Sequence, residues 1–158
     1  MEKRVKRVYV DMSVFYGAPA KEFSHDSKVF WDTVRRGEII LIVSDVLDAE
    51  LRRAPAYVQR LFDLLPESHI EHVVSTDASD KLAAEYIAQN VVGESSLDDC
   101  KHIALATITR ADALVSWNFK HIVNRREGYN DVNDALGYPK IKIQSPNQKE
   151  VQHDETSN

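Results

Sequence analysis

The sequence predicts an α/β domain built on a mainly parallel sheet. Three short apolar runs support this: Lys6–Val10 is rich in β-branched residues, 38–43 is almost wholly apolar, and 113–117 is apolar and follows a turn. Segments with the apolar spacing of helices lie between these runs, and strands that alternate with helices are typical of a parallel sheet. A continuously apolar strand is expected where helices cover both faces of such a sheet.

The length and composition indicate a single domain. A chain of 158 residues is long enough for one core, so we expect a domain over residues 1–146 and a polar tail over 147–158. The single cysteine, Cys100, excludes an intrachain disulfide, and no signal-like segment precedes the first strand, so we expect a reducing, cytoplasmic setting. No apolar run approaches the roughly 20 residues of a membrane-spanning helix, so we expect no membrane partner. The net charge of −5 excludes a broadly basic surface, and nucleic-acid contact would need a local basic patch.

The remaining elements follow from apolar spacing and from signals at their ends. We expect helices over 26–37, 45–53, 55–65, 76–90 and 129–136, a helix from 98 to a turn at 110–112, and strands over 70–74 and 141–143. Ser44 and Thr76 are expected to cap the starts of helices, and Gly37 and Gly137 to end them.

Two acids in the first half of the chain are candidates for a site. Asp11 directly follows the first strand, and parallel α/β sheets bind ligands at the carboxyl ends of their strands. The alternative is that Asp11 only caps the next helix. Glu50 lies on the apolar stripe of its helix, whereas Asp48 is turned about 200° from it and faces water. An acid on an apolar stripe needs a partner or a metal, and the alternative for Glu50 is a salt bridge with Arg52 or Arg53.

A pair of acids, Asp98 and Asp99, begins the helix that precedes the run 113–117. With Ile103 at the centre of the buried face, Asp99 lies about 40° from that centre and Asp98 about 140°. Asp99 therefore faces the core at the open end of the helix, and Asp98 faces outward. His102, about 100° from the centre, fits a partly buried, hydrogen-bonded residue better than a metal ligand. Cys100 fits a core residue better than a nucleophile.

The strand 113–117 separates two polar residues, Asp112 and Asn118, by about 20 Å. Only Asn118 belongs to the carboxyl edge, because Asp112 starts the strand. Just beyond Asn118, the run 120–126 is either a surface for RNA or an ordinary solvated charge run. Its basic residues are Lys120, His121, Arg125 and Arg126.

Three acids and one amide, Asp11, Glu50, Asp99 and Asn118, are thus expected at one edge of the sheet. Clustered carboxylates repel one another and raise at least one pKa, and a divalent cation relieves that repulsion. Oxygen ligands without histidine or cysteine favour Mg²⁺ or Mn²⁺. Such a site activates water and holds the oxygens of a phosphodiester during its displacement. We therefore expect these four residues to be catalytic, with the metal on Asp11, Glu50 and Asp99.

The chain resembles the PIN-domain ribonucleases, of the kind found as VapC-type toxins of toxin–antitoxin pairs. The resemblance spans residues 4–146 and is carried by four motifs: VDMSVFYG at 10–17, SDVLDAEL at 44–51, LDDCKHIALAT at 97–107 and LVSWNFKHIVN at 114–124. It implies a three-layer αβα sandwich, a Mg²⁺- or Mn²⁺-dependent endoribonuclease, a homodimer and a VapB-like antitoxin partner. Asp11, Glu50 and Asp99 match the acids of the family, and His102 its histidine. Asn118 stands where many members carry a further aspartate.

Two functions follow. The first is hydrolysis of RNA, with Lys120, Arg125 and Arg126 as substrate contacts. The second is a non-catalytic or weakly active module that binds RNA or protein, which Asn118 and the low overall basicity favour.

Overall fold

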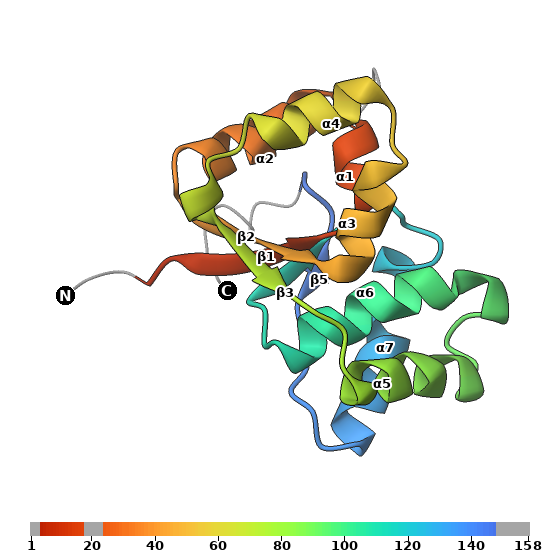
Figure 1. Cartoon of the computed structure of the whole chain (residues 1–158). Helices are drawn as coiled ribbons and strands as arrows, with labels where there is room; N and C mark the ends of the chain where they lie inside the picture. The colour runs from red at the N-terminus through yellow and green to blue at the C-terminus, as the bar shows by residue number, and fades with distance from the viewer. Residues whose placement is uncertain (1–3, 18–23, 148–158) are drawn as a thin grey trace.

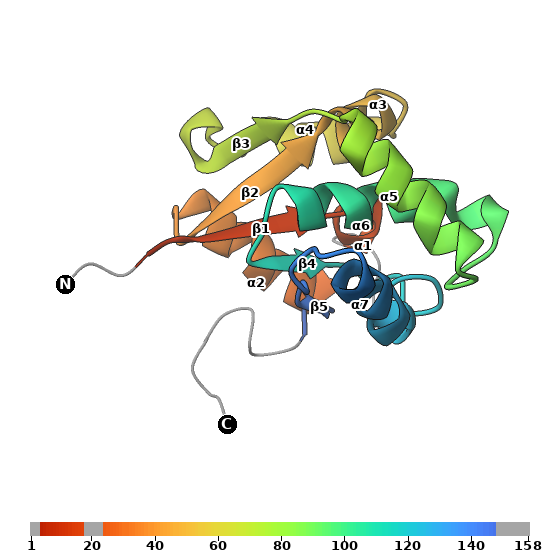
Figure 2. The ribbon, with the colours of Figure 1, turned by 90° about the horizontal axis from the view of Figure 1, so that it is seen from below.

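The computed structural model describes residues 4–17 and 24–147 of the chain. At its centre is a sheet of five parallel strands in the order β3-β2-β1-β4-β5 (Figures 1 and 2). The strands are β1 (Lys6–Val10), β2 (Ile39–Ser44), β3 (Ile70–Val73), β4 (Ala113–Val115) and β5 (Ile143–Gln144). β1 occupies the middle of the sheet, where Val8 pairs with Leu41 of β2 and with Ala113 of β4. The expected parallel sheet is confirmed.

Helices cover both faces of the sheet, as Figures 1 and 2 show. One layer contains α1 (Met12–Gly17), α2 (Ser24–Arg35), α3 (Asp45–Arg52) and α4 (Ala56–Asp63), and the other contains α5 (Asp77–Ala88), α6 (Leu97–Ile108) and α7 (Arg126–Ala135). Short 3₁₀ turns lie at Glu67–His69, Glu94–Ser96 and Val123–Arg125. Alternate side chains of β1 enter the two layers, since Val8 and Val10 join the α1–α4 core and Tyr9 joins the α5–α7 core. The expected three-layer sandwich is confirmed.

The expected helix caps are confirmed. The Oγ of Ser44 accepts the N–H of Leu47 at 3.1 Å and so begins α3. Thr76 and Ser79 form a reciprocal capping box at the start of α5. Gly37, with φ of +77°, reverses the chain after α2, a conformation that favours glycine.

Two elements near the C-terminus differ from expectation. The helix expected over 129–136 begins at Arg126, because its first residues are polar and carry no apolar period. The last strand is Ile143–Gln144 rather than 141–143, because the side-chain amide of Asn130 hydrogen-bonds both the N–H and the C=O of Ile141. Of the expected tail, residues 148–158 lie outside the described residues. No helix within the described ranges is long and apolar enough to cross a bilayer.

One close contact joins the start of the chain to the segment after β4. A Cβ atom on Gly17 would lie 2.7 Å from Cδ1 and Nε1 of Trp117, so only glycine lets α1 approach this ring so closely. The indole N–H of Trp117 donates to Oγ of Ser27 in α2 at 2.9 Å. These contacts hold the residues after β4 beside those after β1, at the carboxyl edge of the sheet.

Candidate active site at the carboxyl edge of the sheet

Asp11 is buried at the end of β1, with 5% of its surface exposed. Its Oδ1 accepts a hydrogen bond from Oγ of Ser13 at 2.6 Å, and Ser13 Oγ in turn accepts the backbone N–H of Trp117 at 2.8 Å. Burial raises the pKa of Asp11 to about 6 against the opposing effect of the Ser13 hydrogen bond, and the charge of Asp99 adds to the rise. Asp11 is therefore a carboxylate that is costly to ionise in the absence of a cation.

Asp99 lies in the first turn of α6 and is half-buried, whereas Asp98 is exposed, as the helix phase predicted. Burial raises the pKa of Asp99, with smaller repulsion from Glu50 and Asp98. The charge of Asp99 also contributes to the raised pKa of Asp11, so these two acids, far apart in sequence, belong to the same edge of the sheet.

Glu50 reaches the same region from α3. Its Oε1 accepts the Nε2–H of His102 at 2.9 Å, and its side chain is 22% exposed. The partner is therefore His102 rather than Arg52 or Arg53, which are both exposed. Glu50 meets His102 because α3 packs against α6, which places the histidine opposite the carboxylate. Asp48, expected to face water, is partly buried.

His102 belongs to a buried chain of polar groups. It is 2% exposed, and its Nδ1 is hydrogen-bonded to the hydroxyl of Tyr9 at 2.7 Å. That hydroxyl also hydrogen-bonds Oγ of Ser44 at 2.6 Å. Burial lowers the pKa of His102, but the hydrogen bond and the charge of Glu50 outweigh it, so the pKa is raised overall. The expected hydrogen-bonded histidine is confirmed, although it is fully rather than partly buried.

Asn118 connects the strand end to Asp99. Its Oδ1 accepts the backbone N–H of His121 at 3.0 Å, and its Nδ2 lies 3.5 Å from Oδ2 of Asp99, a long hydrogen bond. Its own N–H donates to Oγ of Ser116 at 2.8 Å. Asp112 lies at the opposite edge, where it binds Arg4 and the N–H of Arg7, so its exclusion from the site is confirmed.

Ser13 is the residue that sequence reasoning missed. It links Asp11 to the backbone after β4 through the two hydrogen bonds given above. The available signal was its position two residues after an acid that ends a strand. A serine there is also an ordinary helix-start residue, so the sequence did not separate the two roles.

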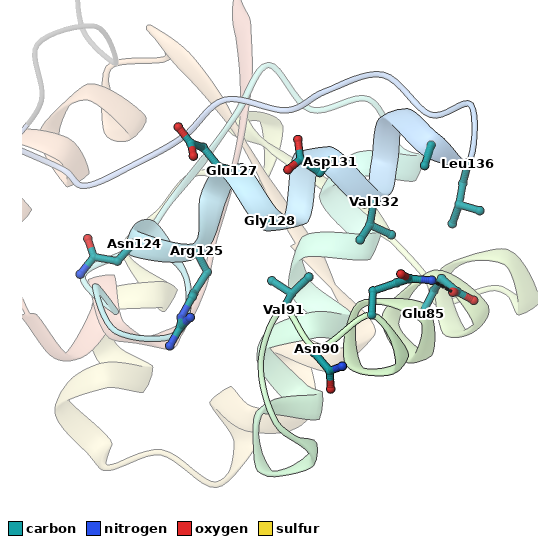
Figure 3. Close-up of a pocket in the computed structure, with 12 residues that line it drawn as sticks. Glu85, Asn90, Val91, Asn124, Arg125, Glu127, Gly128, Asp131, Val132 and Leu136 are labelled. Carbon is teal, nitrogen blue, oxygen red and sulfur yellow. Dashed lines mark hydrogen bonds between the residues drawn. The ribbon is translucent and has the colours of Figure 1, made fainter.

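Two of the basic residues of the run 120–126 lie side by side, because the Nε–H of Arg125 donates to the C=O of Lys120 at 3.3 Å. Arg125 lines a cleft of about 520 Å³ between α5 and α7, shown in Figure 3, together with the carboxylates of Glu85, Glu127 and Asp131. Arg126 lines a different cleft with Lys140 and Lys142. Lys120 is exposed in the loop that follows Asn118. The larger cleft is acidic and offers phosphate little attraction. Neither Asp11 nor Asp99 lines it.

The donor atoms at the edge suit a hard divalent cation in their chemistry. Burial raises the pKa values of Asp11 and Asp99, with added repulsion from Asp99 on Asp11 and from Glu50 and Asp98 on Asp99, and a bound cation would relieve both effects. Within the described residues, no three His, Cys, Asp or Glu side chains form a group ready to hold a metal. Mg²⁺ is commonly held by only one or two carboxylates together with water and substrate phosphates. The pair Asp11 and Asp99 fits that kind of site, not a closed protein cage.

Comparison with known proteins shows the fold. No protein-family model matches the chain, and no curated protein matches its sequence significantly. The crystal structure of VapC20 from Mycobacterium tuberculosis, a toxin that cleaves the sarcin–ricin loop, is similar, with a TM-score of 0.56 and 12% sequence identity. The match covers 85% of this chain and 98% of VapC20. The chain therefore has a PIN-like fold of the VapC kind.

Proposed function

We propose that this protein is a divalent-metal-dependent endoribonuclease that hydrolyses RNA phosphodiester bonds, as the toxin of a type II toxin–antitoxin pair. The observation that carries the proposal is that the segment after β4 links two acids at the carboxyl edge of a PIN-like sheet: Ser13 joins Asp11 to the N–H of Trp117, and Asn118 reaches Asp99. The pKa of each acid is raised. The likeness to VapC20, a toxin that cleaves the sarcin–ricin loop, supports RNA as the substrate.

Each residue has a role in this proposal. A bound Mg²⁺ or Mn²⁺ supplies an activated water and neutralises charge on the phosphodiester. Asp11 and Asp99 hold the cation, Ser13 orients Asp11, and Asn118 orients Asp99. Glu50, fixed by His102, is the third acid beside them.

The partners in the proposal are RNA, a VapB-like antitoxin and a second copy of the chain. Lys120, in the loop that follows Asn118, is the best placed of the basic residues to meet a phosphate at the acid edge. Arg125, whose Nε–H donates to the C=O of Lys120, and Arg126, in the cleft with Lys140 and Lys142, would contact RNA farther along the strand. The proposed setting is the cytoplasm, where RNA and the antitoxin are both present.

A non-catalytic module that binds RNA or protein is the second candidate. Two observations favour it. The described residues contain no group of three metal-binding side chains, and the carbonyl oxygen of Asn118 is taken by His121. Such a module would use the same edge for binding without hydrolysis.

Cleavage of RNA by purified protein tests the proposal. We expect cleavage with Mn²⁺ or Mg²⁺ and none with a chelator. Loss of a residue that only hydrogen-bonds a metal ligand typically lowers activity by roughly 10- to 100-fold. Asp11→Asn and Asp99→Asn remove the ligands themselves, so each should lower the cleavage rate by more than that. Asp98→Asn is the matched control, because Asp98 is exposed beside Asp99. Cleavage that survives both site variants would show a contaminating nuclease. RNA binding without cleavage, and without heat of Mn²⁺ binding at millimolar metal, would establish the second candidate.

A further inference from the structure

Phe119 is an exposed aromatic ring next to the acid edge. It follows Asn118 directly, and 39% of its surface is exposed. Within the described residues the exposed aromatic side chains are Tyr16, Tyr57 and Phe119. One of the three, Phe119, lies beside Trp117, with 6.3 Å between the ring centroids. Single exposed apolar residues are common, so exposure alone does not make Phe119 a binding residue.

The loop that carries Phe119 is held in one conformation. The backbone C=O of Asn118 accepts the N–H groups of Ile122 and Val123 at 3.1 and 3.0 Å. The C=O of Phe119 accepts the N–H of Asn124 at 2.8 Å, and the hydroxyl of Tyr129 donates to the C=O of His121 at 2.8 Å. Because Trp117 is itself fixed to Ser27, it supports one side of the Phe119 ring. The ring therefore loses little conformational freedom when a ligand stacks on it.

The groups around this ring match the parts of a nucleotide. Phe119 directly follows Asn118, whose side chain reaches Asp99, and its ring lies beside Trp117, whose backbone N–H donates to the Ser13 that holds Asp11. Lys120, the following residue, is exposed and offers a cation for phosphate. An aromatic face accepts any nucleobase by stacking, and a base within a continuous duplex is already stacked on its neighbours.

We infer that Phe119 is the surface on which an unpaired base of the RNA substrate stacks. RNA as the ligand rests on the proposed function. The assignment of Phe119 rests on its exposure, its rigid loop and its place between Asn118 and Lys120.

Binding is measured with cleavage blocked. Every variant carries Asp11→Asn, and the probe is a single-stranded RNA of about twelve nucleotides that contains 2-aminopurine, alone or annealed into a duplex. Phe119→Ala should weaken binding of the single strand by about 5- to 150-fold, the range for loss of one stacked base. It should also remove the quenching of 2-aminopurine on binding. Phe119→Trp should restore both, Tyr57→Ala should change neither, and the duplex should bind weakly with or without Phe119.

The inference is overturned if Phe119→Ala leaves the affinity for the single strand unchanged, or lowers the affinity for single strand and duplex equally. It is also overturned if Phe119→Ala abolishes self-association on gel filtration, because Phe119 would then be a protein contact. Cleavage by chains with native Asp11 separates this inference from the proposed function. Cleavage unaffected by Phe119→Ala leaves the ribonuclease standing and removes the stacking role. Stacking without any cleavage leaves Phe119 as a base-binding residue and removes the ribonuclease. No binding of either RNA rejects both.

Discussion

Asn118 lies between Asp99 and His121 and contacts both through one side-chain amide. Its Oδ1 accepts the N–H of His121 at 3.0 Å, and its Nδ2 lies 3.5 Å from Oδ2 of Asp99. A backbone N–H only donates, so the oxygen must face His121 and the amino group must face Asp99. The amide therefore turns its amino group toward the acid and its oxygen toward the backbone of His121.

Asn118→Asp should increase metal affinity. The change replaces a donor to Asp99 with a further carboxylate, which raises the pKa of Asp99 in the absence of metal and gives a cation one more charged ligand. We expect Mn²⁺ binding to tighten by about tenfold, equivalent to about 1.4 kcal/mol, measured by calorimetry. Asn124→Asp, an exposed change in the same loop, is the control. Equal affinities in all three proteins would contradict the role given to Asn118.

Asp11→Asn should stabilise the protein at neutral pH. The pKa of Asp11 is raised to about 6, whereas that of an unfolded aspartate is about 3.9, so the folded state binds the proton more tightly. The stability that this proton contributes is complete below about pH 4 and is lost as the pH rises to about 6. In urea unfolding, the variant should be about 1–3 kcal/mol more stable than the native protein at pH 7. It should also lack the loss of stability that the native protein shows between about pH 4 and 6.

Asp112→Asn should change the stability at pH 7 in the opposite direction and serves as the control for Asp11→Asn. The pKa of Asp112 is lowered because its hydrogen bonds to Arg4 and the N–H of Arg7 outweigh partial burial. Its contribution is present above about pH 4 and is lost below it. This variant should therefore be less stable than the native protein at pH 7. Destabilisation by Asp11→Asn at pH 7 would show that the native carboxylate is already satisfied.

Added Mn²⁺ should raise the melting temperature, and a chelator should reverse the effect. A ligand at one hundred times its dissociation constant stabilises by about 2.7 kcal/mol. Asp99→Asn should abolish the shift and Asp98→Asn should retain it, because Asp99 is half-buried beside Asn118 whereas Asp98 is exposed. The same shift in both variants would place the metal elsewhere on the molecule.

Tyr9→Phe should destabilise the buried network. The substitution keeps the ring in the core but removes the hydroxyl between Ser44 and His102, leaving Nδ1 of His102 without its partner. We expect a loss of about 1–3 kcal/mol in urea unfolding. Tyr57→Phe, on an exposed ring, should change stability by less than about 0.5 kcal/mol. A neutral Tyr9→Phe would mean that the imidazole finds another partner.

Gly17→Ala should disturb Trp117. The added methyl would stand 2.7 Å from the indole, so the ring or α1 must move, at a cost of about 1–3 kcal/mol. Tryptophan fluorescence should shift, and thermal unfolding should begin at a lower temperature. Gly93→Ala, where no atom lies within 4 Å of the new methyl, is the matched control. An unshifted spectrum would show that the contact relaxes freely.

Much of the fold could be predicted because local signals agree with the final packing. The run 38–43 is apolar because helices cover both faces of β2, and Ser44 marks the start of α3 through its own hydrogen bond. Helix phase separated Asp99 from Asp98 because one face of α6 packs against the sheet. The strand at the C-terminus was misplaced because a side chain, that of Asn130, takes the bonding groups of Ile141.

The finer contacts of the site depend on pairs far apart in sequence. Glu50 meets His102 across 52 positions, and Ser13 meets the backbone of Trp117 across 104. No periodic pattern encodes such pairs, because they depend on how α1, α3 and α6 lie against one another. The nearby arginines were the local alternative for Glu50, and local proximity was misleading.

The central place of β1 sets the order in which the molecule can be completed. β1, the first strand of this sheet in chain order, is paired on one side with β2 and on the other with β4, which begins about one hundred positions later. Until that strand emerges, one edge of β1 lacks its neighbour, and Asn118 has yet to reach Asp99. Such distant pairings slow folding, and a nascent chain of this topology stays incomplete until most of it has been translated. A stalled or truncated chain that ends before β4 would therefore carry Asp11, Glu50 and Asp99 without the strand that brings Asn118 to them.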